Sequence, residues 1–135
     1  PAQNINFTNK TQFLFRISKG TLNVNDNDVN RYFPKESIRI PFDNIVYIGD
    51  SQTDIPCMKL VNSLGGQAIG VYDPKLKNKE RVHSLIRDKR IKYFAAADYS
   101  KNKDLEKLLK QIIDYSKATF ALKQEYYKNL EESEL

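Results

Sequence analysis

The apolar and polar positions of the chain are organised around residues 45–54. Four consecutive apolar residues at 45–48 run directly into Gly49 and Asp50, and a second acid follows at Asp54. An apolar run without alternation that is rich in β-branched residues predicts a strand buried on both faces. Thr53 or Asp54 is suited to cap a following helix. The pattern therefore predicts two carboxylates at the carboxyl end of a buried strand, where open α/β sheets bind their ligands.

The segments on either side alternate between helical and strand patterns. A stripe formed by Cys57, Leu60, Val61 and Leu64 has the spacing of one helix face and predicts a helix over 54–64. Gly65 and Gly66 end that helix before an apolar strand. Strand, helix and strand within about 30 residues make a β-α-β unit and predict an α/β fold with a parallel sheet. The remaining patterns predict helices over 10–19, 77–89 and 103–132 and strands over 67–72 and 91–98.

The last of these helices defines the domain organisation. About 30 helical residues would extend about 45 Å, which is more than a domain of this size needs. We expect the helix either to break near 117–119 or to project and pack elsewhere. Residues 1–100 are accordingly predicted to form a core domain and residues 101–135 a C-terminal helix.

Composition narrows the class of protein. The 135 residues are enough for one modest core, and their 40% hydrophobic content is below the usual ~45–50%. The net charge of +5 comes from scattered Lys and Arg, which favours a solvated basic face over a nucleic-acid surface.

Cys57 is the sole cysteine and lies in the core stripe, so we expect a packing role and a reducing, cytoplasmic compartment. No apolar run approaches ~18 residues, so no membrane segment is expected.

The motif G-D-S-Q-T-D at 49–54, with the helix and strand that follow it, resembles the fourth signature motif of the haloacid dehalogenase (HAD) superfamily of phosphatases. The resemblance implies a Rossmann-like, three-layer fold with a parallel sheet, a Mg²⁺ ion and an aspartate nucleophile. It also implies that Asp50 is a metal ligand and that Asp54 ligates the metal or holds its water. Ser51 would bind substrate at the rim of the metal, although a polar residue there also suits the cap of a turn.

A second stretch, N-F-T-N-K-T-Q at 6–12, resembles the third motif of the same superfamily. Its lysine pairs with the nucleophile and the phosphoryl group, and the matching residue is Lys10. The alternative is a solvated lysine near a helix start, where the helix dipole does not favour a cation. Lys19 is the reserve candidate, but its place beside Gly20 is also explained by the end of a helix.

The first motif of the superfamily, a D-x-D after an apolar strand, is missing. The D-x-D at Asp26–Asp28 lies in a polar run with no apolar strand before it. We therefore expect the C-terminal part of a hydrolase that acts on a small phosphorylated metabolite and that is inactive without an N-terminal segment. Loss of the flanking strands would leave an open sheet edge, so the missing segment or a second copy should bind there.

A non-catalytic binding or interaction module is the competing hypothesis. The acidic pair at Asp50 and Asp54 would then be a turn followed by a helix cap, and the long C-terminal helix or the basic surface would bind the partner. A receiver domain of a signalling protein has the acidic pair, phosphoacceptor and lysine in a different order. The sequence favours the hydrolase hypothesis over both.

Overall fold

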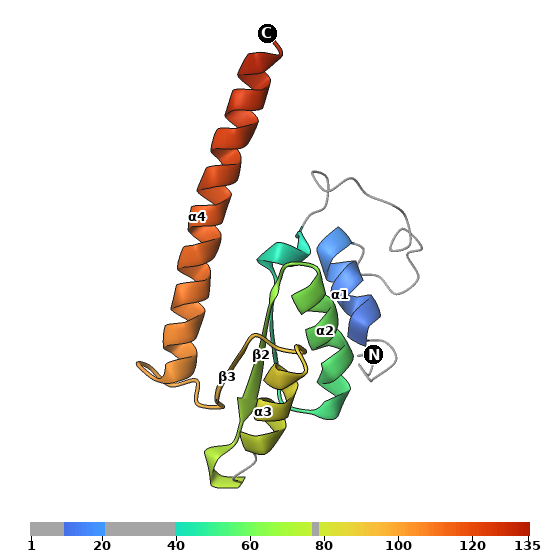
Figure 1. Cartoon of the computed structure of the whole chain (residues 1–135), viewed down its shortest axis with the longest axis vertical. Helices are drawn as coiled ribbons and strands as arrows, with labels where there is room; N and C mark the ends of the chain where they lie inside the picture. Colours follow the sequence, from blue (N-terminus) through green and yellow to red (C-terminus); the bar gives the residue numbers. More distant parts are fainter. Residues whose placement is uncertain (1–9, 21–39, 77–78) are drawn as a thin grey trace. The chain divides into compact units, whose positions relative to one another are not determined.

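A computed structural model describes residues 10–20, 40–76 and 79–135 (Figure 1). The protein is α/β, with a three-stranded parallel sheet and a long C-terminal helix. Two compact units divide the chain at Pro1–Ala97 and Asp98–Leu135. The D-x-D at Asp26–Asp28 and the residues that precede Lys10 in the resemblance to the third motif lie outside the described residues.

The sheet contains β1 (Val46–Gly49), β2 (Gln67–Tyr72) and β3 (Tyr93–Ala96) in that spatial order. Residues 46–49 of β1 pair in parallel with 67–70 of β2, and residues 69–72 of β2 pair with 93–96 of β3. Each crossover carries a helix, which is why successive strands run parallel. The three strands expected from the apolar runs are confirmed, and β3 lies at an edge of the sheet.

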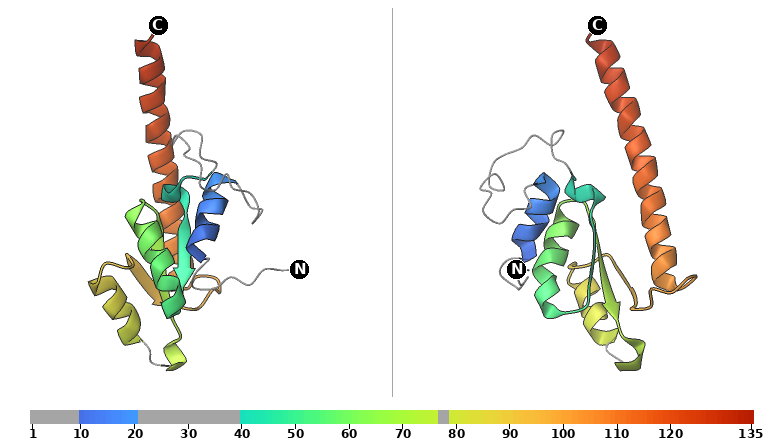
Figure 2. Two further views of the ribbon diagram at one scale, coloured as in Figure 1. Left: turned by 90° about the vertical axis from the view of Figure 1, so that its right-hand side faces the viewer. Right: turned by 180° about the vertical axis from the view of Figure 1, so that it is seen from behind.

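Three helices lie on one face of the sheet, namely α1 (Lys10–Lys19), α2 (Ile55–Ser63) and α3 (Lys79–Arg87) (Figure 2). On α2, Cys57 and Val61 are fully buried as the stripe predicts, and Met58 is fully buried beside them. Leu64 is 46% exposed, because α2 ends at Ser63 and the chain turns away through Gly65 at a φ of 94°. The core therefore comes from the sheet-facing stripe of α2 and its neighbours.

The prediction that the central strand is buried on both faces is wrong. Within β1, Val46 is 37% exposed, and only Gly49 is buried. By contrast Ala68 and Ile69 of β2 are fully buried. The reason is position, because among the described strands β2 is central and β1 is an edge strand that pairs with β2 alone.

The second unit consists mainly of α4 (Asp104–Ser133), one unbroken helix of 30 residues. Of the two alternatives left open by the sequence, the break near 117–119 does not occur. Asp104 and Glu106 place negative charge in the first turn, where it favours the helix dipole, and Glu106 pairs with Lys110 at 2.9 Å. None of the described helices combines the length and apolar character needed to cross a membrane.

Candidate functional site

The candidate site lies where β1 ends. Gly49 is followed by a 3₁₀ turn at Gln52–Asp54, which leads directly into α2. A Cβ atom on residue 49 would lie 2.5 Å from Cε of Met58 and 2.7 Å from Cβ of Asp54. Only glycine fits this position, because α2 and the turn close tightly over the end of the strand. This close approach puts the Asp54 side chain directly over the carboxyl end of β1.

The Asp54 carboxylate is the centre of a hydrogen-bond network. Its side chain is 11% exposed, and both of its oxygens accept hydrogen bonds. Oδ1 accepts from Lys10 Nζ at 2.9 Å and from Tyr47 OH at 2.7 Å. Oδ2 accepts from the backbone nitrogens of Asp50 and Ser51 at 3.1 and 3.2 Å and from Ser51 Oγ at 3.1 Å. Ser51 and Asp54 thus form a capping box for the turn.

Lys10 reaches this network from the first turn of α1. Its Nζ lies 3.0 Å from Thr53 Oγ1 and 2.9 Å from Asp54 Oδ1, although these residues are 43 and 44 positions away along the chain. The Lys10 side chain is 22% exposed, so the ion pair is partly withdrawn from water. Lys19, the reserve candidate, lies at the opposite end of α1. The structure thus brings Lys10, rather than Lys19, to the turn.

The remaining two predicted residues behave differently from each other. The Ser51 hydroxyl is engaged within the turn, with Asp54 and with Thr53 Oγ1 at 2.8 Å. Asp50 is exposed, and within residues 10–20, 40–76 and 79–135 no group donates a hydrogen bond to its carboxylate. Asp50 therefore contributes its backbone N–H to the network and leaves its carboxylate for another partner.

Burial and hydrogen bonding act in opposite directions on Asp54. Burial raises the pKa of its carboxyl group, but the hydrogen bonds from Lys10, Tyr47, Ser51 and Asp50 favour the anion and lower the pKa to about 2. Burial also raises the pKa of Tyr47, and the hydrogen bond to Asp54 raises it further. The site therefore holds a carboxylate anion next to a neutral phenol and an ammonium group.

Tyr47 and Thr53 belong to the network but were not expected from the sequence. Tyr47 and Gly49 are two residues apart on β1, so their side-chain positions lie on the same face of the sheet, under α2. A tyrosine in an apolar strand needs a partner for its hydroxyl, and this requirement was the available signal. Thr53 was considered only as a possible helix cap, because its contact with Lys10 depends on a residue from a distant helix.

The oxygen donors at this site fit a hard cation only in part. Mg²⁺ commonly keeps several waters and binds one or two carboxylates, and the exposed Asp50 carboxylate has the required chemistry. Direct coordination by Asp54 would require one of its present hydrogen bonds to be replaced. Across the described residues there is no group of three His, Cys, Asp or Glu side chains that could hold a metal ion. A complete metal site would therefore need ligands from outside these residues or from the substrate.

Comparison with known proteins gives one informative match. The chain is 30% identical over 101 residues to an uncharacterized protein of Borreliella burgdorferi, a match that covers 75% of this chain. It covers 34% of that relative, so the chain spans about a third of the length of the curated relative it matches. No protein-family model and no solved structure matches the chain.

Proposed function

We propose that the chain is part of a Mg²⁺-dependent phosphohydrolase of the HAD superfamily, with a Rossmann-like core, acting on a small phosphorylated metabolite. The observation that carries this proposal is the Lys10–Asp54 contact of 2.9 Å at the carboxyl end of β1. Two motifs that the resemblance links, 44 residues apart, meet in one partly buried ion pair. The sole cysteine is buried, which fits the reducing, cytoplasmic compartment that we also propose.

Each residue has a defined role in this proposal. Asp54 and Thr53 hold the Lys10 ammonium in one position, where it would contact an oxygen of a phosphoryl group. Asp50 would hold the Mg²⁺ ion, and the bound ion would polarise the phosphoryl oxygens. Ser51 is fixed by the capping box, and its hydroxyl would contact substrate at the rim of the site. The nucleophile would come from residues other than those that the structure describes.

The metal assignment predicts a difference between two aspartates. We expect Mn²⁺, used as a paramagnetic substitute for Mg²⁺, to broaden the amide NMR signals of 49–54 selectively in this chain. Asp50→Asn should abolish the effect because it removes the one exposed carboxylate of the turn. Asp114→Asn on α4 makes the same change in charge and should leave the effect intact. Broadening that survives D50N, or that D114N also removes, would contradict the assignment.

Turnover tests the hydrolase assignment itself. The chain alone should not hydrolyse p-nitrophenyl phosphate, whereas the full-length gene product that contains it should do so with Mg²⁺. Lys10→Met in that protein should lower kcat by about 10²–10³-fold, which is typical when one electrostatic contact to the transition state is removed. Equal activity of the K10M variant and the unaltered protein would rule out the role given to Lys10.

A non-catalytic binding module is the second candidate, and a specific observation favours it. Both oxygens of Asp54 are already used by the capping box, Tyr47 and Lys10, so this acid is accounted for as part of a turn at a helix start. In that case Mn²⁺ should not broaden the amide signals of 49–54 selectively, even in the unaltered chain. The Mn²⁺ titration therefore separates the two candidates.

We also propose that the open edge of β1 binds another strand, from the rest of the whole protein or from a second copy. The Gln67 nitrogen donates to the Ile45 carbonyl at 3.0 Å, so the backbone groups of the alternate residues Val46 and Ile48 point away from β2. Among the described residues these groups have no strand partner. An unpaired edge of this kind recruits other chains.

Strand addition makes a prediction about self-association. Sedimentation velocity of this chain should show concentration-dependent dimers, which Val46→Pro should abolish. Proline at this position removes an outward N–H but keeps the β1–β2 ladder, and Ile45 already has the extended backbone that precedes proline. Val46→Thr is the matched control and should still associate. A chain that stays monomeric over the whole concentration range would contradict binding of a second copy.

A further inference from the structure

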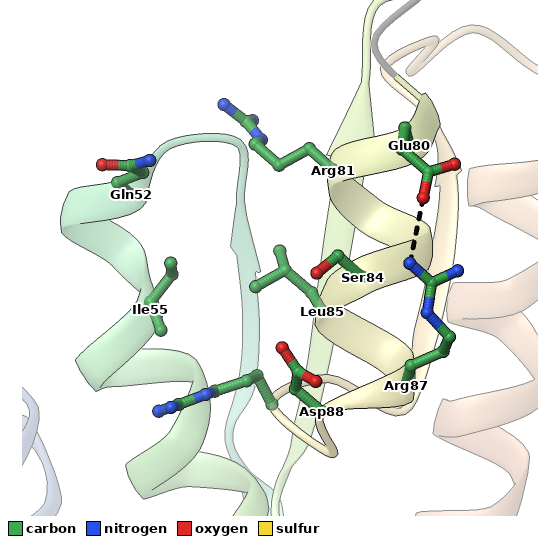
Figure 3. Close-up of a pocket in the computed structure, with 9 residues that line it drawn as sticks. Gln52, Ile55, Glu80, Arg81, Ser84, Leu85, Arg87 and Asp88 are labelled. Carbon is green, nitrogen blue, oxygen red and sulfur yellow. Dashed lines mark hydrogen bonds and ion pairs between the residues drawn. The ribbon is translucent and has the colours of Figure 1, made fainter.

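A groove on the outer side of the helical layer lies between α2 and α3 (Figure 3). Its volume is about 520 Å³, within the range of about 300–1,000 Å³ typical of small-molecule sites. Ile55 from α2 and Leu85 from α3 form its apolar part, and Gln52 and Ser84 add neutral hydrogen-bonding groups. The groove therefore combines a contact surface for an organic body with polar groups that could orient it.

The charges of the groove are not balanced. Arg87 pairs with Glu80 at 2.9 Å, and Figure 3 shows this pair on the flank of α3 that faces away from α2. Arg81 and Arg90 also line the groove and are partly buried. Neither has an ion-pair partner among the residues that the structure describes. Asp88 is the one remaining acid, so the groove keeps a net positive charge.

The two arginines are well separated along the groove. Arg81 lies in the first half of α3, and Arg90 follows its last residue, Arg87. The six helical steps from Arg81 to Arg87 alone extend about 9 Å. The spacing of the two backbone positions therefore suits a molecule with an anionic group at each end better than one small oxyanion. Guanidinium groups form bidentate hydrogen bonds with phosphate, and phosphate carries nearly two charges at neutral pH.

We propose that this groove is a binding site for a small organic bisphosphate, with one phosphate on Arg81 and the other on Arg90. The carbon skeleton would lie over Ile55 and Leu85. The site is separate from the Lys10–Asp54 pair and does not depend on the hydrolase proposal. Gln52 is shared between the groove and the 3₁₀ turn that holds Asp54, so a bound ligand would lie beside that turn.

The test is a calorimetric titration of this chain with fructose 1,6-bisphosphate at constant ionic strength, with inorganic phosphate and succinate as comparison ligands. We expect saturable binding of the bisphosphate, at least tenfold tighter than that of either comparison ligand. Arg81→Gln and Arg90→Gln should each weaken it about tenfold, because each removes a charge-assisted contact. Asp88→Asn should strengthen binding, because it removes the acid that opposes the ligand.

Two control variants test whether the bisphosphate binds in the groove and not elsewhere on the chain. Lys89→Gln loses the same charge next to Asp88 and Arg90 but does not line the groove, so its effect should be below about twofold. Lys10→Met should leave binding unchanged, which separates this site from the hydrolase candidate. The proposal would be overturned if K89Q weakened binding as much as R81Q does, or if inorganic phosphate bound more tightly than the bisphosphate. It would also be overturned if K10M lost binding of the bisphosphate, or if the bisphosphate showed no saturable binding at all. Retained binding in R81Q and R90Q variants with unaltered circular dichroism would do the same.

Discussion

Replacing Asp54 by asparagine should lower the free energy of unfolding by about 3 kcal/mol, whereas the same change at Asp50 should cost less than about 0.5 kcal/mol. The two acids lie in one motif, four residues apart, but only Asp54 is buried. In D54N an amide NH₂ would face donors that now meet a carboxylate oxygen, and the Lys10 ammonium would lose its ion pair. Urea unfolding of the two variants measures the difference directly.

The difference in stability between the unaltered chain and D54N should also depend on pH. The pKa of Asp54 is lowered to about 2 in the folded chain, from an ordinary value of 3.8. A group whose pKa is depressed by folding stabilises the protein above its unfolded pKa and stops doing so as the pH falls through its folded pKa. Between about pH 4 and pH 2 the unaltered chain should therefore lose about 2 kcal/mol of stability that D54N has already lost.

The stability difference between the unaltered chain and D54N should thus narrow at acid pH, while that between the unaltered chain and D50N should not change. Parallel stability curves for the unaltered chain and D54N down to pH 2 would show that Asp54 is not held as a charged acceptor. A D50N variant that is as unstable as D54N would mean that burial does not distinguish the two acids.

Local patterns predicted most of the elements of the fold. The strand over 67–72 matches β2 residue for residue, because its apolar run is bounded by Gly66 and Asp73. The helix over 10–19 matches α1 and ends at Gly20, where φ is 77°. Each of these signals lies within a few residues of the feature that it predicts, so no tertiary information was needed.

Burial was predicted less well than helix or strand. Ile17 and Ile86 lie three and four residues after the buried Leu14 and Val82, a spacing that predicts burial on the same helix face, but they are 40% and 36% exposed. Ser18 is buried instead of its neighbour, and its hydroxyl donates to the carbonyl of Ile40. The periodicity of apolar residues predicts that a helix has an apolar face. The angle at which the helix packs on its neighbours decides which edge of that face they bury.

The candidate site was predictable in its local part only. Asp50, Ser51 and Asp54 are neighbours in sequence, so their joint position follows from a strand that ends in a turn. The meeting of Lys10 with Asp54 across 44 residues followed from the family resemblance and from no pattern in the chain. Tyr47 was missed because its place on an apolar strand suggested packing, whereas its hydroxyl is a member of the network.

Gly49 connects the packing of the fold to the chemistry of the site, and its replacement by alanine should affect both. The added Cβ would approach Cβ and Cγ of Asp54 to 2.7 and 2.8 Å and Cε of Met58 to 2.5 Å. The flexible end of Met58 can move, but the Asp54 atoms are held by the turn and its hydrogen bonds. We expect a loss of about 2–3 kcal/mol in unfolding free energy, as for other overpacked sites.

Gly70→Ala is the matched control, because Gly70 lies on the neighbouring strand and on the same face of the sheet. The nearest atoms to a Cβ there are the ends of two side chains, Ile91 Cδ1 at 2.8 Å and Val82 Cγ1 at 3.3 Å. Its cost should be nearer 1 kcal/mol, and it should leave the pKa of Asp54 at about 2. In G49A the displaced carboxylate loses hydrogen bonds, so its pKa should rise, as followed by carboxyl carbon NMR. A destabilised G49A variant with an unshifted Asp54 pKa would mean that α2 moves away as a unit, and that the glycine serves packing alone.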